Sequence, residues 1–218
     1  YDFKNILIPS NNEYILDIES LIHLEEKSNY FDNNIYKEKA TVCIIGSIHL
    51  QNNQYKSFQD FTINDLSVIE EKNIVYNWVQ TLKICEDNVI KIYHWGHAEK
   101  TYLQNLKDKY KDIIFPKLML IDLLQFFRSE PIIVKDCFDF GLKTIGKALH
   151  KHGLIHTTWT DTDNGLDAMI KFKEISEMNH HKQIPLKRYS EIKEIIHYNQ
   201  VDCIVLMEIL QFLRDKYL

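Results

Sequence analysis

The stretch of residues 14–20, YILDIES, constrains the fold more than any other, because it puts two carboxylates inside an apolar run. Its apolar residues favour strands and Asn11 and Asn12 precede it, so it predicts a short buried β-strand. Strand side chains alternate between two faces, and Asp17 and Glu19 therefore point the same way. Two like charges side by side destabilise a core strand unless a positive charge lies between them.

A hard divalent cation would satisfy this pair, since Mg²⁺ and Mn²⁺ both bind carboxylate oxygens. The simpler interpretation is an edge strand whose acidic face is solvated, and an Asp-x-Glu pair taken alone favours it. The remainder of the chain therefore has to decide between a metal site and a surface strand.

The size and composition of the chain favour one globular domain. Its 218 residues, 45% of them hydrophobic, can bury one substantial core, so we expect a single domain over residues 1–218. Because the chain opens on Tyr1 without a methionine, we expect it to be part of a longer polypeptide. No apolar run approaches a membrane span and no signal-peptide pattern is present, which predicts an intracellular protein without a membrane partner. The abundance of Asn, Ile, Lys and Tyr is typical of an AT-rich genome.

The net charge, the cysteines and the histidines exclude few functions. The net charge of -5 argues against indiscriminate coating of nucleic acid, although an enzyme can combine catalytic carboxylates with a local basic patch. The four cysteines are scattered and form no C-x-x-C pair, which indicates reduced thiols. Several histidines are paired, but without neighbouring cysteines or a His-Glu-x-x-His helix they do not favour a zinc site.

The order of apolar runs predicts an α/β fold. Strands are expected over residues 14–20, 41–48 and 55–61, paired as an antiparallel meander because the links between them lack helical periodicity. The polar residues 21–39 predict an irregular connection.

The second part of the chain adds helices and a parallel strand. Asn64 and Asp65 are expected to cap a helix that carries apolar residues at helical spacing as far as Leu82, and a strand follows over residues 89–93. This order suggests a right-handed crossover onto the same sheet. We therefore expect a central mixed sheet flanked by helices, with a polar loop at 157–163 and further helices opening near Glu99 and covering 141–149, 166–178 and 190–218.

The last of these helices holds a second unusual constellation, Tyr198-Asn199-Gln200-Val201-Asp202. Tyr198 and Asp202 are four residues apart and share one helix face. The neighbours of Asp202 are apolar, so its carboxylate enters the core side, where acids are rare unless paired or bound to metal. Taken alone, a tyrosine hydroxyl bonded to a structural aspartate is the simpler explanation of the pair.

Two further acids are candidates. Glu99 lies in the first turn of a helix directly after a strand, where the helix dipole also gives a structural reason for a carboxylate. Asp122, inside the apolar segment 118–127, is a candidate either to take the place of Glu99 or to act as an additional acid.

The ordered set resembles the DEDD superfamily of ribonuclease-H-like 3′→5′ exonucleases, in its tyrosine-containing branch. The set consists of Asp-x-Glu on the first strand, an acid after the fourth strand and Tyr-x-x-x-Asp on the last helix. The third acid of that superfamily is usually Asp, and the Glu found here resembles the YprB-like branch, which is also found fused to RecB-family nucleases and helicases. The resemblance extends to the runs YHWGHAE (93–99), IDL (121–123), FGLKTI (140–145) and HYNQVDC (197–203).

The resemblance implies a ribonuclease-H-like fold and a nuclease that uses two Mg²⁺ or Mn²⁺ ions. Two cations about 3.5–4 Å apart would stabilise the attacking hydroxide, the pentavalent phosphorus and the leaving oxygen. By resemblance, Asp17 bridges the two ions and Glu19 and Asp202 complete the ion on the nucleophile side. Glu99 then holds the second ion, through water or directly, and Tyr198 orients the attacking water.

Substrate binding requires positive charge and stacking surfaces near the acids. Lys143, Lys147 and Lys151 share one helix face, a pattern that is more often a solvated surface. Lys143 is nevertheless the first candidate for a substrate contact, because it lies in the family-like run 140–145.

Three residues beside the expected third acid complete the substrate candidates. Trp95 and His97 precede Glu99 and are candidates for contacts with a terminal nucleotide, although ordinary packing also explains Trp95. Asp122 is the third of these candidates for a substrate contact.

Three functions stay open on the sequence. The first is a 3′→5′ exonuclease acting on single-stranded DNA or RNA ends, whose direction comes from the resemblance alone. The second is a non-catalytic nucleic-acid-binding or scaffolding module of a larger helicase–nuclease. The third is a structure-specific endonuclease that uses the same metal centre.

Overall fold

Five strands form one mixed sheet in the order β3-β2-β1-β4-β5. The computed structural model describes residues 7–24, 38–83, 89–130, 132–160, 165–179 and 184–217. The first three strands pair antiparallel, and β4 and β5 run parallel to β1. This arrangement confirms the expected meander with added parallel strands and is consistent with a ribonuclease-H-like fold. The strands are β1 (Asn12–Leu24), β2 (Glu38–Gln51), β3 (Gln54–Thr62), β4 (Ile90–His94) and β5 (Leu118–Asp122).

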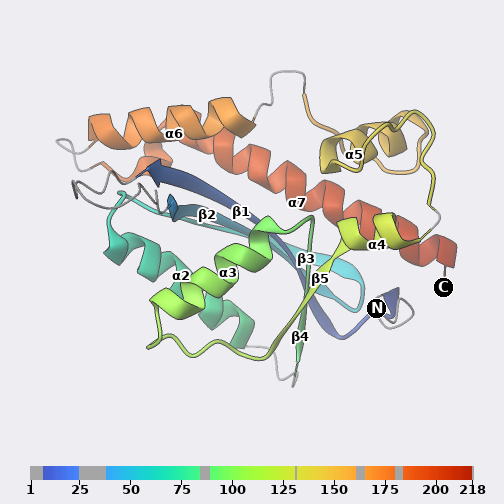
Figure 1. The fold of residues 1–218 in the computed structure, drawn as a ribbon, viewed down its shortest axis with the longest axis horizontal. Helices are drawn as coiled ribbons and strands as arrows, with labels where there is room; N and C mark the ends of the chain where they lie inside the picture. The colour runs from blue at the N-terminus through green and yellow to red at the C-terminus, as the bar shows by residue number, and fades with distance from the viewer. Residues whose placement is uncertain are drawn as a thin grey trace, which may run out of the picture.

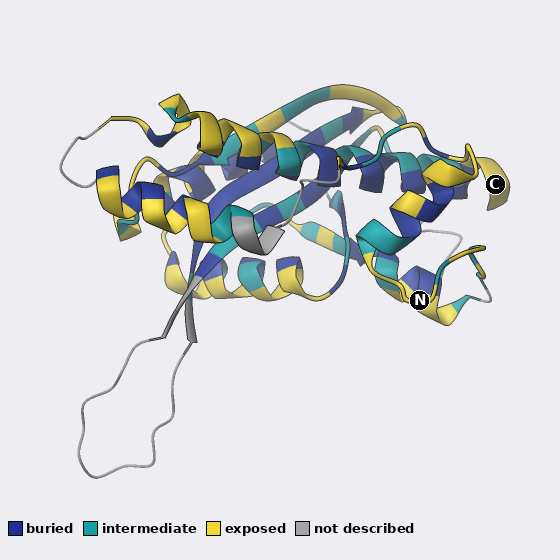
Figure 2. Ribbon diagram, turned by 90° about the horizontal axis from the view of Figure 1, so that it is seen from above, coloured by how far each residue is buried: buried dark blue, intermediate teal, exposed yellow. Residues whose placement is uncertain are grey.

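Helices cover both faces of the sheet. In Figure 1, α2 (Val68–Lys83) and α3 (Ala98–Lys109) lie on one side, and the long α7 (Ser190–Tyr217) crosses the other side. The remaining elements gather around α7. They are α4 (Leu123–Ser129), α5 (Leu142–Lys151), α6 (Gly165–Asn179) and a 3-10 turn, η1 (Leu186–Arg188). Figure 2 shows the buried strands between helices whose outer faces are exposed.

The structure corrects two local predictions. Residues 21–24 and 38–39 continue β1 and β2 and are not an irregular connection, while residues 25–37 lie outside the described part. The helix expected to be capped by Asn64 and Asp65 begins at Val68, and its cap is Ser67, whose hydroxyl accepts the backbone N–H of Glu70 at 3.2 Å. A serine followed three residues later by glutamate is a recognised helix start, so this cap was open to prediction.

Two composition-based expectations concern cysteines and membranes. Cys43, Cys137 and Cys203 are free thiols, and Cys85 lies outside the described residues. None of the helices within the described ranges combines the length and apolar character needed to cross a bilayer.

Alternation along β1 separates two hydrophobic cores. Tyr14, Leu16 and Ile18 pack with the residues of α2 and α3, whereas Ile15 packs in the second core with residues of α7. Because side chains repeat every second residue up to the register shift after Glu19, Asp17 and Glu19 share the face of Ile15. The predicted acidic pair of β1 therefore faces α7.

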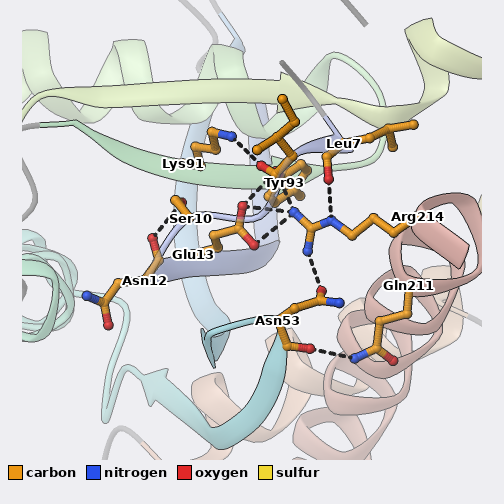
Figure 3. A network of polar contacts seen from close by, with 10 residues as sticks. Leu7, Ser10, Asn12, Glu13, Asn53, Lys91, Tyr93, Gln211 and Arg214 are labelled. Atoms are coloured by element: carbon orange, nitrogen blue, oxygen red, sulfur yellow. Dashed lines mark hydrogen bonds and ion pairs between the residues drawn. The ribbon is translucent and has the colours of Figure 1, made fainter. Parts of the chain in front are cut away.

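A buried ion pair fixes α7 to the start of β1. Arg214, near the end of α7, and Glu13 are 3% and 0% exposed. A terminal nitrogen of Arg214 lies 2.8 Å from each carboxylate oxygen of Glu13 and donates to the Tyr93 hydroxyl at 3.0 Å. Its Nε donates to the carbonyl of Leu7 at 2.8 Å, and Asn53 accepts a further bond (Figure 3). These contacts determine which part of α7 lies over which residue of β1.

We expect Arg214→Met to lower the free energy of unfolding by about 3–5 kcal/mol, because it leaves the Glu13 charge buried without a partner. Urea denaturation measures this loss, with Lys216→Met at an exposed site of α7 as the control. Adding Glu13→Gln to Arg214→Met should recover part of the stability. Equal stability of the Arg214 and Lys216 variants would show that the ion pair does not anchor the helix.

Candidate metal centre

Three of the predicted carboxylates meet where α7 crosses β1. Asp17, Glu19 and Asp202 each place one oxygen so that all three atoms lie within 4.8 Å of one another. Within the described ranges, this is the one group of three or more His, Cys, Asp or Glu side chains close enough to share a metal ion. We refer to these three residues as the acidic cluster.

Asn199 holds the first carboxylate of the acidic cluster in place. Its amide nitrogen donates to Asp17 Oδ2 at 2.6 Å and lies 3.3 Å from the Asp17 carbonyl oxygen. Asn199 is fully buried, whereas Asp17 is half-buried, so these bonds lie at the border of the core. This contact places one turn of α7 directly on β1.

The close approach of α7 depends on a glycine in β2. Gly46 is the register partner of Asp17, and a Cβ at Gly46 would lie 1.7 Å from Asn199 Oδ1. Any larger residue would therefore displace Asn199. A glycine inside an otherwise apolar strand often marks such an approach of another segment.

Asp202 is held by two donors. The indole nitrogen of Trp159 donates to Asp202 Oδ1 at 2.5 Å, and the hydroxyl of Tyr198 also bonds this carboxylate. The bond from Tyr198 agrees with the prediction that Tyr198 and Asp202, which are four residues apart, share one face of the helix. Trp159 lies in the predicted polar loop at 157–163, of which residues 161–163 lie outside the described part.

Glu208, farther along α7, fixes the loop that carries Trp159. Its carboxylate accepts the backbone N–H groups of His156 and Thr157 at 2.8 and 2.9 Å and the Thr157 hydroxyl at 2.8 Å. These bonds hold the loop against α7, so that the Trp159 indole reaches Asp202.

Glu99 lies near the acidic cluster but outside the 4.8 Å group. It occupies the first turn of α3, is 5% exposed, and its Oε2 has no hydrogen-bond partner. The nearest basic atom is His94 Nδ1 at 3.7 Å, which is too far for a hydrogen bond. Its charge contributes to the raised pKa values of both Asp17 and Glu19.

Burial and mutual repulsion raise the pKa values of Asp17 and Glu19. Burial is the largest cause for Asp17, whose pKa lies well above its ordinary value, followed by the charges of Asp202, Glu19 and Glu99. Burial likewise leads for Glu19, whose pKa rises from 4.5 to about 7 through the charges of Asp202 and Glu99, while Lys143 lowers it. At neutral pH, the protein therefore opposes full ionisation of its own carboxylates.

The same observations fit a bound cation. Every ligand atom that the cluster offers is a carboxylate oxygen, and the repulsion that raises the pKa values would be relieved by a positive ion among them. The unpartnered Oε2 of buried Glu99 is a further oxygen without a hydrogen-bond donor. The acidic cluster could thus bind a metal ion.

Burial also raises the pKa of Tyr198, with further contributions from the charges of Asp202, Glu19 and Asp17. The phenol therefore stays protonated and acts as a donor. Lys143, the first substrate candidate, places its ammonium group 4.7 Å from the centre of the Tyr198 ring. This candidate thus lies beside the acidic cluster.

The other substrate candidates occupy different settings. His97 is exposed at the N-terminus of α3, and Trp95 donates its indole N–H to the carbonyl of Phe140 at 3.0 Å. Asp122 accepts the backbone N–H groups of Gly96 and Leu124 at 2.8 and 2.9 Å. Asp122 therefore caps α4 and shapes the turn before α3.

Sequence reasoning gave no role to three residues that build this centre: Asn199, Trp159 and Gly46. Asn199 is a polar residue one turn before Asp202 on a mostly apolar helix, and Gly46 interrupts an apolar strand, so both carried a signal. Trp159 carried none, because the tryptophan stands in a polar segment whose path depends on Glu208.

We expect the metal-free protein to lose stability as pH rises. Below pH 4.5 the Glu19 carboxyl is protonated in both folded and unfolded chains, and between 4.5 and about 7 the folded state retains a proton that the unfolded chain has released. The free energy of unfolding should fall over this window, by up to about 3 kcal/mol.

Thermal unfolding in chelator, compared with unfolding in Mg²⁺ or Mn²⁺, measures this effect. A bound cation should raise the melting temperature more at about pH 8 than at about pH 5, because protons compete for the same oxygens. Glu19→Gln should flatten the pH dependence, and Glu194→Gln, at an exposed site of α7, is the control. An identical pH profile for both variants would contradict the shifted pKa of Glu19.

We expect Gly46→Ala to lower the free energy of unfolding by about 1–3 kcal/mol, since the added methyl group overpacks the contact with Asn199. The three atoms nearest to that methyl group all belong to Asn199. Adding Asn199→Ala should therefore recover part of the loss in a denaturation experiment. If the double variant is no more stable than Gly46→Ala alone, this contact is not the cause.

Comparison of the sequence with protein families finds no family that matches it, and comparison with curated proteins finds no match.

Proposed function

We propose that this protein is a metal-dependent nuclease that hydrolyses phosphodiester bonds at the 3′ ends of DNA or RNA strands. The observation that carries the proposal is the meeting of Asp17, Glu19 and Asp202, from the first strand and the last helix, beside the buried Glu99. Few structural roles require such a concentration of repelling carboxylates. A site that holds divalent cations does.

The chemistry of the ligand atoms selects the cations. Oxygen-only sites of this kind suit Mg²⁺ or Mn²⁺, and Asp17, Glu19 and Asp202 would hold them, with Glu99 as a further ligand. Two such ions, when bound, activate a water molecule and neutralise the charge on the phosphate group under attack.

The residues around the carboxylates keep them in position. Asn199 fixes Asp17, and Trp159 fixes Asp202, so neither carboxylate has to be ordered when the site fills. Tyr198 remains protonated because its pKa is raised by burial and by the nearby acids. It is therefore suited to orient a water molecule by hydrogen bonding and not to abstract its proton.

Lys143 supplies positive charge on the substrate side. Its charge acts on Glu19, and its ammonium group lies 4.7 Å from the Tyr198 ring centre and 6.0 Å from that of Trp159. A phosphate oxygen placed over the acidic cluster would find a cationic side chain here. The direction of digestion and the preference for ends rest on the family resemblance.

We expect Asp17→Asn to abolish Mg²⁺- or Mn²⁺-dependent digestion, because it removes one ligand charge without changing the size of the side chain. Tyr198→Phe should reduce kcat by about 10²-fold, since it removes one orienting hydrogen bond. Asp215→Asn, at an exposed site of α7, is the matched control. Full activity of Asp17→Asn would remove the proposal.

The digestion is best followed on 3′- and 5′-labelled DNA and RNA, together with circular single-stranded DNA. Loss of label from the 3′ end with intact circles supports an exonuclease, whereas cut circles indicate an endonuclease at the same centre. Isothermal titration with Mn²⁺ distinguishes both nucleases from a non-catalytic scaffolding module. Strand binding without cleavage and without Mn²⁺ binding would indicate a scaffolding module.

A further inference from the structure

A basic hollow adjoins the acidic cluster. Its volume is about 430 Å³, and Lys143 at its inner end lies over the Tyr198 ring. The hollow follows one side of α5, so that it leads away from the carboxylates. Its lining consists of Asp136, Lys143, Thr144, Lys147, Ala148 and Lys151.

The lysines of this hollow differ in their partners. Lys151 pairs with Asp136 at 2.7 Å, and His152 lies 3.2 Å from the same carboxylate. The negative charge of Asp136, the one acid in the lining, is therefore balanced by Lys151. Lys147 is exposed, and no acidic side chain within the described ranges forms an ion pair with it. Lys147 is therefore the uncompensated charge that a ligand in the hollow would meet, and Lys143 adds the positive charge nearest to Tyr198 in the lining.

Exposed aromatic side chains lie in the segment that leads from Asp136 of the hollow to the start of α5. Asp136 is bonded to the last turn of α5, and Asp139 accepts the N–H of Gly141 at its first turn, so residues 136–141 run beside the helix, as Figure 1 shows. Phe138 in this segment is 99% exposed, and Phe140 is 39% exposed. A phenylalanine this exposed contributes nothing to the core.

We propose that Lys143, Lys147 and Phe138 bind a single nucleic-acid strand that leads away from the acidic cluster, with lysines on its phosphates and Phe138 stacked on a base. The identity of the ligand rests on the proposed function. Single-strand sites combine a positive groove with aromatic platforms, because every base has a face that can stack. An acidic protein segment would use the lysines but has no need of Phe138, and a duplex keeps its bases enclosed.

Fluorescence anisotropy with a labelled oligothymidylate, in chelator so that nothing is cleaved, tests this face of α5. Lys147→Ala should weaken binding and reduce the slope of log affinity against log salt by about 0.7, because one phosphate contact is lost. Phe138→Ala should weaken binding by about five-fold or more and leave the salt slope unchanged. An abasic strand of the same length should be insensitive to Phe138→Ala.

Two matched controls are available elsewhere on the surface. Lys56→Ala on β3 removes an exposed lysine, and Ile69→Ala on α2 removes an apolar side chain that is 72% exposed. Neither should alter strand binding. The proposal is overturned if Lys147→Ala and Phe138→Ala bind like these controls, or if polyglutamate displaces the strand as well as unlabelled oligothymidylate does.

The outcome is separable from that of the proposed function. If both variants lose strand binding while the unaltered protein cleaves nothing in Mg²⁺ or Mn²⁺, the strand site stands and the nuclease proposal fails. If the unaltered protein digests labelled ends while both variants bind and digest them equally well, the nuclease proposal stands and the strand site fails.

Discussion

The position of α7 on β1 is the constraint on which the rest of the structure depends. The buried pair of Arg214 and Glu13 fixes one end of the helix, and the bond from Asn199 to Asp17 fixes it again near the middle. A shift of the helix by one residue would break both contacts. Asp202 consequently lies over the acidic pair of β1, although the two segments stand at opposite ends of the sequence.

This anchoring lets the fold tolerate a centre that would otherwise weaken it. Burial and the repulsion between neighbouring carboxylates both disfavour the charged forms of Asp17 and Glu19, as their raised pKa values indicate. The free energy that opposes this repulsion comes from elsewhere, mainly from the two cores on either face of the sheet. Gly46 contributes differently, because its missing side chain creates the space in which Asn199 reaches Asp17.

Much of the fold and part of the centre could be predicted from local periodicity. The period of two along residues 14–20 correctly put Asp17 and Glu19 on one face, and the period of the last helix put Tyr198 beside Asp202. The contact from Trp159 could not be predicted in this way, since it depends on the path of a loop that Glu208 holds from a distant turn. The extension of β1 through residues 21–24 was missed for a related reason. Residues 21–24 follow a register shift between Glu19 and Ser20, and their pairing with residues 38–41 comes from the partner strand, which no local pattern records.

The hydrogen bonds from the loop to Glu208 limit which substitutions homologous sequences can accept at the loop positions. His156 bonds Glu208 through its backbone N–H alone, so any residue other than proline can occupy position 156 and keep this hydrogen bond. Thr157 contributes its hydroxyl as well, which narrows the choice to serine or threonine. Relatives of this protein should therefore vary freely at position 156 while they keep a carboxylate at 208 wherever they keep an indole at 159.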